Sequence, residues 1–163
     1  MKTISNSQLT IRVSPHGAEL CNIVCNGKEY LWQADPSFWK RHSPVLFPIV
    51  GSVWENEYRI DGATYNLTQH GFARDMNFEL IREQPDELRY RLADNEESRR
   101  RYPFPFRLEI GYRIQGKQIE VLWEVKNTGD KELHFQIGAH PAFYFPAFDM
   151  KSNERGYLGF DRT

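Results

Sequence analysis

His140 is the residue of this chain best suited to proton transfer. It lies in segment 135–146, where an expected strand runs into a histidine-proline turn, and Pro141 fixes the backbone beside it. An imidazole with an ordinary pKa of about 6.5 can donate or accept a proton near neutral pH. The local pattern alone is equally compatible with a structural histidine at a strand end.

Apolar and polar residues alternate before this turn. The odd positions from Leu133 to Ile137 are apolar and would face a core, whereas His134, Gln136 and, in a regular strand, His140 would face the open side. A group of aromatic residues follows and would offer flat apolar walls to a ligand: Phe143, Tyr144, Phe145 and Phe148. The segment therefore predicts a ligand-binding face on an antiparallel sheet.

The amino-acid composition limits the classes of protein to which the chain can belong. The 163 residues are 40% hydrophobic, 14% aromatic and 26% charged, which predicts one soluble globular domain spanning 1–163. The 21 basic and 22 acidic side chains leave a net charge of -1, so neither nucleic acid nor an anionic membrane is expected as a partner. No apolar leader or membrane-length run is present, which favours a cytoplasmic location.

The two cysteines, Cys21 and Cys25, are four residues apart in an extended stretch. They would share one face of a strand but lie too far apart for a disulfide, so we expect reduced thiols. No pair of cysteine or histidine residues has the spacing of a metal site, and no metal is predicted.

Turn signals divide the chain into short strands. Asn26-Gly27 predicts a hairpin among strands at 8–13, 19–25 and 28–32, and Asp61-Gly62 predicts a second hairpin. Residues 35–39 fit one helical turn capped by Asp35. Two prolines favour an edge or loop for 43–51. Segment 69–75 is either a loop whose polar side chains hold hydroxyl groups or a solvated connection.

The second half has the clearest strand pattern. Residues 76–84 and 88–93 predict a strand pair, and the charged run 94–101 predicts an exposed loop or short helix. Alternation through 106–115 and 119–125, followed by the strand carrying His140, predicts a three-stranded antiparallel meander. Because no stretch has sustained helical periodicity, the fold class is all-β, an antiparallel β-sandwich rather than a closed barrel.

Four motifs, in this order, resemble the aldose 1-epimerase (galactose mutarotase) family, and within it the LacX-like branch. They are Pro44-Val-Leu-Phe-Pro-Ile-Val-Gly51, Asn56-Glu-Tyr58, His70-Gly-Phe-Ala-Arg-Asp75 and Gly138-Ala-His-Pro-Ala-Phe143. The resemblance covers essentially the whole chain. It implies the N-terminal portion of a galactose mutarotase-like supersandwich that interconverts the α and β anomers of a free hexose without a cofactor.

The resemblance also implies roles for individual residues. His140 matches the histidine that protonates the ring oxygen of the sugar, and His70 matches one that hydrogen-bonds the sugar nearby. Arg74 matches a position near the ligand that helps to hold an anion in relatives that bind sugar phosphates. Asn56 and Phe143 lie in the matched motifs and are expected to contact the substrate.

Two positions depart from the family pattern. Ser52 stands where the family usually has an arginine that holds the sugar. The general base of the family is a glutamate in a region that follows the last residue here, Thr163. We therefore expect a truncated chain, with an open sandwich that self-associates. A non-catalytic sugar-binding or vestigial module and a purely structural β-domain are the alternatives.

Overall fold

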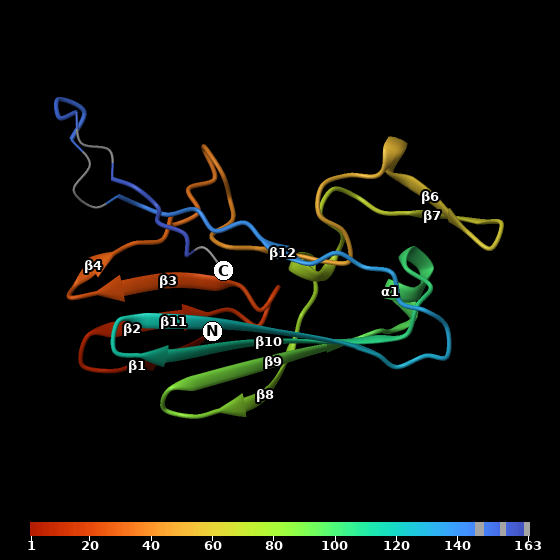
Figure 1. The fold of residues 1–163 in the computed structure, drawn as a ribbon, viewed down its shortest axis with the longest axis horizontal. Coiled ribbons are helices and arrows are strands. Elements are labelled where there is room, and N and C mark those ends of the chain that lie inside the picture. Colours follow the sequence, from red (N-terminus) through yellow and green to blue (C-terminus); the bar gives the residue numbers. More distant parts are fainter. Residues whose placement is uncertain (146–148, 154–155, 162–163) are drawn as a thin grey trace.

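The computed structural model describes residues 1–145, 149–153 and 156–161. Two four-stranded antiparallel sheets make up most of it (Figure 1). The first sheet has the order β1 (Lys2–Ser5), β2 (Leu9–Val13), β3 (Leu20–Cys25) and β4 (Lys28–Glu29). The second has the order β11 (Gln118–Asn127), β10 (Phe106–Gln115), β9 (Glu87–Ala93) and β8 (Glu79–Glu83).

Two smaller antiparallel pairs and three short helical segments complete the described fold. One pair joins β5 (Val45–Leu46) to β12 (Gly138–Ala139), and the other joins β6 (Glu57–Ile60) to β7 (Ala63–Asn66). The helical segments are the 3-10 turns η1 (Trp54–Asn56) and η2 (Ala73–Asp75) and the helix α1 (Glu96–Arg101). The predicted all-β class is confirmed.

The two large sheets pack face to face around one apolar core. Every second residue of β10 from Phe106 to Ile114 is buried there, as its alternation predicts. Two buried tyrosines connect the layers, because the hydroxyl of Tyr112 donates to the carbonyl of Ala18 at 2.7 Å and that of Tyr90 to Val13 at 3.5 Å. The sandwich predicted from the sequence is therefore present.

The outer face of the second sheet is a layer of ion pairs. Glu87 and Glu109 are buried although both are charged. Arg113 reaches Glu87 at 2.8 Å, and Arg91 and Arg107 reach Glu109 at 3.0 and 3.2 Å. Buried carboxylates require such partners, which explains why this face of β10 is polar in sequence yet largely covered.

The predicted three-stranded meander is wrong in its last strand. After β11 the side chain of Asn127 accepts from Gly129 at 2.9 Å and donates to Lys131 at 2.7 Å, and the chain leaves the sheet. Residues 128–137 have no strand structure. The backbone carbonyl of His134 instead accepts a hydrogen bond from the hydroxyl of Tyr102 at 2.7 Å. Only Gly138–Ala139 is a strand, and it pairs with β5 rather than β11.

Several local predictions are confirmed. Asn95 caps helix α1 with a reciprocal capping box, so the charged run is a short helix. Asp35 accepts from the backbone of Ser37 at 2.9 Å in the expected single turn. Both cysteines are free. Strand β1 was not predicted, since only Ile4 of its residues is buried and the alternation is too short to recognise.

Segment 69–75 is not a solvated connection. Gly71, Phe72 and Ala73 are buried in the core, and only the polar residues around them reach the surface. None of the helices in the described ranges is long and apolar enough to span a membrane.

Candidate functional site

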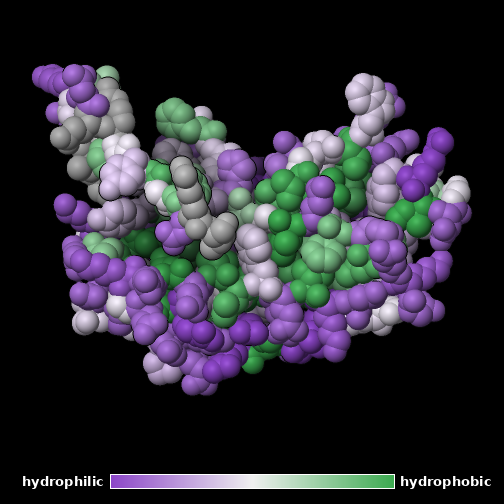
Figure 2. All heavy atoms as spheres, viewed as in Figure 1, coloured by the Kyte–Doolittle hydropathy of each residue, from purple (hydrophilic) through white to green (hydrophobic). Residues whose placement is uncertain are grey.

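The structure brings His70 and His140 together from distant parts of the chain. Their ring centroids are 6.3 Å apart. His140 follows β12, and its backbone N–H donates to the carbonyl of Pro44 at 3.1 Å, which continues the pairing of β12 with β5. In Figure 1 this pair lies above the two large sheets, between the loop before β5 (orange) and the β6–β7 hairpin. Figure 2, in the same view, shows the upper outline of the molecule hollowed between that loop and that hairpin.

His70 is fixed by the turn at Gly51. Its backbone has a φ of 65°, its N–H donates to the carbonyl of Gly51 at 2.7 Å, and the N–H of Gly51 donates to its Nδ1 at 3.0 Å. A nitrogen that accepts a hydrogen bond carries a lone pair, so the proton of the neutral imidazole is on Nε2. His70 is therefore a hydrogen-bond donor through Nε2.

The surroundings of His70 keep it neutral. Burial lowers its pKa below the ordinary value, and the positive charge of Arg74 and the neighbouring His140 lower it further. His70 consequently suits hydrogen bonding to a hydroxyl or ether oxygen at neutral pH rather than carrying a charge.

The aromatic ring that packs on His140 is Trp39. The two ring centroids are 5.1 Å apart with an interplanar angle of 51°. The carbonyl of Trp39 accepts from the indole of Trp32 at 2.7 Å, which holds the 35–39 turn in place. Trp39 was not among the predicted site residues. Its sequence pattern indicated only a short turn, and His140, the residue it contacts, lies much later in the chain.

Arg74 lies in a group of charges at the edge of this site. Its Nη2 donates to the carbonyl of Gln69 at 2.6 Å, and its Nε is 3.7 Å from the carboxylate of Asp75. The same carboxylate pairs more closely with Arg41, at 2.8 Å. Burial and the charge of Arg41 lower the pKa of Arg74, while Asp75 acts in the opposite direction. Two guanidinium groups share one carboxylate, which leaves a local positive charge.

Ser52 lies just before η1 and Asn56 is its last residue; both are exposed. The carbonyl of Asn56 accepts from the backbone of Leu67 at 2.9 Å, so its turn is fixed to the loop that leads to His70. In the described part of the chain, no side-chain contact joins Asn56 to either histidine. Its role in binding stays a prediction.

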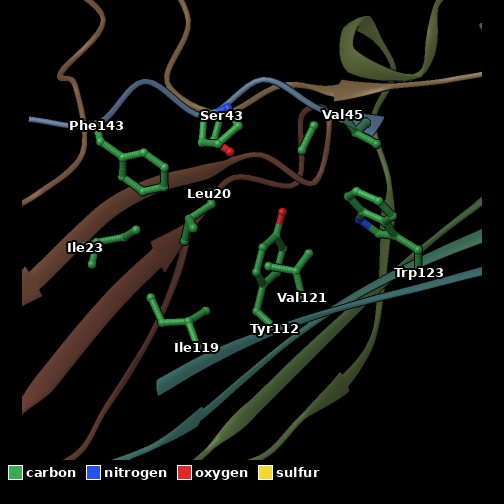
Figure 3. A pocket seen from close by; sticks show the side chains of 11 residues that line it. Leu20, Ile23, Ser43, Val45, Tyr112, Ile119, Val121, Trp123 and Phe143 are labelled. Carbon is green, nitrogen blue, oxygen red and sulfur yellow. The ribbon is translucent and has the colours of Figure 1, made fainter. Parts of the chain in front are cut away.

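Phe143 belongs to a different feature. It lines an apolar cavity of about 320 Å³ between β3 and β11, shown in Figure 3. The cavity wall is formed by Leu20, Ile23, Ser43, Val45, Tyr112, Ile119, Val121, Trp123, Ala139, Pro141 and Phe143. Neither site histidine lines this cavity. Phe143 therefore lies at the mouth of this apolar cavity, 54% exposed, rather than beside the paired imidazoles.

The predicted aromatic wall after His140 is only partly formed. Tyr144 packs on Trp32 with ring centroids 5.7 Å apart, so it supports the same tryptophan that holds Trp39. Phe145 is 37% exposed. Phe148 lies outside the described residues.

The sandwich of two antiparallel sheets is a galactose mutarotase-like β-fold. The chain belongs to the aldose 1-epimerase family, whose model matches residues 1–155. It is 33% identical over 172 aligned residues to both the plasmid and the chromosomal LacX protein of Lactococcus lactis subsp. lactis, covering 98% of this chain. It covers 56% of those proteins, so it spans about half their length.

Solved structures agree with this assignment. A galactose mutarotase related enzyme from Lactobacillus acidophilus superposes with a TM-score of 0.89 at 40% identity, covering 93% of this chain and 51% of that one. A galactose mutarotase-like protein from Lactobacillus casei ATCC 334 superposes with a TM-score of 0.85 at 35% identity, covering 88% and 49%. These similarities confirm both the family and the fold predicted from the sequence.

Proposed function

We propose that this chain carries the acid and substrate-orienting part of an aldose 1-epimerase-type isomerase acting on a free hexose. The observation that supports this most directly is the pair of imidazoles of His70 and His140, whose ring centroids lie 6.3 Å apart. Trp39 packs on His140 and offers an apolar face beside it. A flat apolar surface next to hydrogen-bonding groups suits one face of a sugar ring.

In this proposal His140 is the general acid. Protonated His140 gives its proton to the ring oxygen of the hexose while a base removes the proton of the C1 hydroxyl. The bond between C1 and the ring oxygen breaks, leaving an open-chain aldehyde and a free hydroxyl. Rotation about the bond between C1 and C2 presents the other face of the aldehyde, and closure by the reverse proton transfers yields the other anomer.

His70 orients the substrate in this scheme. Its Nε2–H is the donor that remains once Gly51 occupies Nδ1, and its neutral state lets it bind an oxygen without competing for the proton of His140. Arg74 contributes positive charge that would also suit a phosphorylated hexose. Asn56 completes the proposed sugar contacts. Phe143, proposed from the sequence as well, would act only through the adjoining apolar cavity.

No described residue is assigned as the general base of this reaction. We propose a carboxylate supplied from outside these 163 residues, as the family resemblance implies. A non-catalytic sugar-binding module of the same fold is the second candidate, and one observation favours it. Asp75, the carboxylate adjacent to Arg74, is already engaged in ion pairs with Arg41 and Arg74. We further propose that residues 1–163 act as one cytoplasmic domain without a cofactor.

Polarimetry of freshly dissolved α-D-glucose and α-D-galactose distinguishes the two candidates. Acceleration of mutarotation by the purified chain, lost in His140→Ala, supports the isomerase. Sugar binding by titration calorimetry without acceleration supports the binding module. Absence of both binding and acceleration in a folded protein contradicts both.

A further inference from the structure

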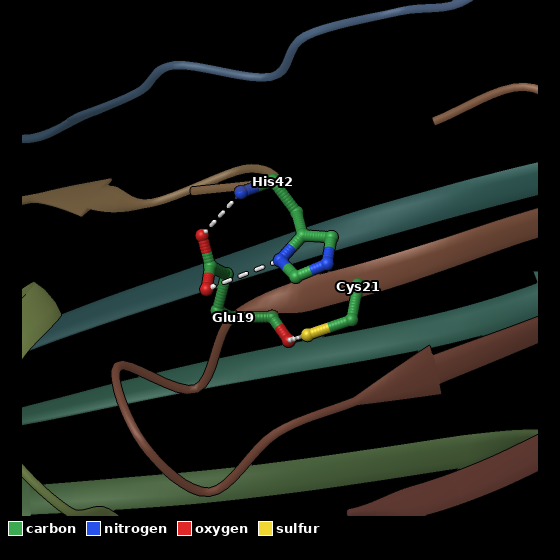
Figure 4. A group of neighbouring side chains, drawn as sticks. All are labelled: Glu19, Cys21 and His42. Atoms are coloured by element: carbon green, nitrogen blue, oxygen red, sulfur yellow. Dashed lines mark hydrogen bonds and ion pairs between the residues drawn. The ribbon is translucent and has the colours of Figure 1, made fainter. Parts of the chain in front are cut away.

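Three potential metal ligands gather beneath the segment that leads to His140. Glu19 and Cys21 lie at the start of β3, and His42 precedes β5 (Figure 4). One carboxylate oxygen of Glu19, the sulfur of Cys21 and a ring nitrogen of His42 all lie within 4.8 Å of one another. None of the three was predicted as a site residue, because ligands from separate segments leave no spacing motif.

The Nδ1 atom of His42 lacks a hydrogen-bond partner among the described residues. It is also buried. The nearest charged atom is Oε2 of Glu19 at 3.6 Å, which is too long for a hydrogen bond. That distance is close to the separation of about 3.3 Å between two ligands that each lie about 2.0 Å from a tetrahedral zinc ion.

Glu19 is held rigidly in the orientation that such a site needs. Its Oε1 accepts from the backbone N–H of His42 at 2.9 Å and of Ser43 at 3.1 Å. These bonds leave Oε2 directed at the imidazole. The carboxylate is therefore preorganised beside His42 before any ion arrives.

Cys21 supplies a third, soft ligand. Its side chain is buried, and Sγ donates to the carbonyl of Glu19 at 3.3 Å. Burial, together with the nearby charge of Glu19, raises the pKa of this thiol to about 11, so it is neutral at neutral pH. A cation that binds the sulfur would displace the thiol proton. The resulting thiolate and the carboxylate carry two negative charges, which balance a divalent cation.

We propose that Glu19 Oε2, Cys21 Sγ and His42 Nδ1 bind one Zn²⁺ ion, with a water in the fourth position. A mixed oxygen, sulfur and nitrogen donor set selects zinc over magnesium or calcium. On binding, the S–H bond of Cys21 breaks, the Zn–S bond forms and one proton leaves to solvent. Oε2 and Nδ1 already lie near zinc-ligand spacing, so binding requires mainly that Sγ move toward them.

From this position the ion would stabilise the backbone around His140. It connects β3 to the segment 42–46, whose carbonyls hold the chain on either side of His140. His42 accepts from the backbone of Ala142 at 3.0 Å, and Pro44 accepts from that of His140 at 3.1 Å. Zinc would thus stabilise the support of the proposed sugar site without contacting the sugar.

Binding of metal to the chelator-treated protein tests this proposal independently of sugar turnover. Titration with Co²⁺ should give one site per chain with a thiolate-to-cobalt absorption band, and Zn²⁺ should displace it. Calorimetry in buffers of different ionisation enthalpy should detect release of about one proton per ion, from the thiol. Zn²⁺ should also raise the melting temperature.

Matched variants separate this site from incidental binding. Cys21→Ser and His42→Gln should weaken zinc binding by at least about tenfold, and Cys21→Ser should abolish the sulfur band. Cys25→Ser and His16→Gln remove the other free thiol and an exposed histidine and should change neither. Absence of Co²⁺ binding to the wild-type protein, or a sulfur band that survives in folded Cys21→Ser, overturns the proposal.

Discussion

The ring centroids of His70 and His140 lie 6.3 Å apart, and different interactions hold the two residues in place. His70 is fixed through its ring by the N–H of Gly51, whereas His140 is fixed through its backbone by the pairing of β12 with β5. Among the described residues no hydrogen bond engages the ring of His140, whereas that of His70 has an assigned tautomer. This difference is the physical basis for assigning them different roles.

Replacing His140 by alanine should remove the general acid. If the chain accelerates mutarotation, His140→Ala should lower the rate constant by about 10²- to 10⁴-fold and change sugar affinity only modestly. Polarimetry and titration calorimetry measure the two effects. His134→Ala, an exposed histidine outside the pair, is the matched control, and an equal loss there would exclude a specific role for His140.

The tautomer of His70 can be observed directly. Long-range ¹⁵N–¹H correlation spectra at neutral pH should show His70 protonated on Nε2 and not on Nδ1, with a protonation midpoint below its ordinary value of 6.5. Arg74→Gln should raise that midpoint, since the charge of Arg74 helps to lower the pKa of His70. A midpoint at or above 6.5 in the wild-type protein contradicts the described environment.

Gly71→Ala should destabilise the fold strongly. A Cβ at this position would clash with the carbonyl oxygen of Phe47, and the backbone has a φ of 71°. The left-handed conformation and the clash together should cost more than about 2 kcal/mol in denaturant unfolding. Gly27→Ala is the control, because its φ of 75° is similar but its Cβ would meet nothing within 4 Å. Equal losses would show that the close approach to Phe47 is not limiting.

Glu87 should contribute stability that depends on pH. Burial by itself raises its pKa, but the hydrogen bond from Arg113 and the charges of Arg82, Arg113 and Arg89 outweigh that effect and lower it. A carboxyl with a lowered folded-state pKa stabilises the fold fully above its ordinary value of 4.5, and this contribution is lost as the pH falls through the folded-state pKa.

The variant Glu87→Gln tests this contribution. It should cost about 1 to 3 kcal/mol of unfolding free energy at neutral pH and less below pH 4, because the buried carboxylate is replaced while its arginines remain. Glu120→Gln, which removes an exposed partner of the same Arg113, should change stability by less than about 0.5 kcal/mol. Urea unfolding at several pH values measures both, and a loss independent of pH would argue against the charge as its cause.

Self-association, predicted from the sequence, has a specific surface to test. In the described residues β11 pairs only with β10, and its exposed Val121 and Trp123 line the apolar cavity. Unpaired strand edges beside apolar surface favour pairing with a second copy. Antiparallel pairing of two β11 strands about Trp123 would set Glu120 opposite Lys126, which adds charge complementarity to the contact.

Sedimentation at several concentrations should therefore show a dimer in equilibrium with monomer. Val121→Lys should shift that equilibrium toward monomer, since a lysine on an edge strand opposes pairing. Thr64→Lys, on an exposed position of β7, should leave it unchanged. A monomer at every concentration, or an association insensitive to Val121→Lys, contradicts the β11 contact.

The sequence by itself determined the all-β class, most strands and the family. Alternation through 106–115 identifies β10, Asp61-Gly62 identifies the β6–β7 hairpin and the run 94–101 ends in a capped helix, because each depends on residues close together in the chain. The motifs around His70 and His140 likewise identify the family without any three-dimensional information. Local patterns suffice wherever local interactions decide the conformation.

Only the tertiary structure decided which segments meet. The segment after β11 alternates like a strand, yet its backbone leaves the sheet and bonds to Tyr102, since packing and not alternation selects the hydrogen-bond partner. Trp39 on His140 and the group of Glu19, Cys21 and His42 join residues with no common spacing. Contacts between distant segments are set by how the two sheets and their loops pack, and a linear pattern does not record that packing.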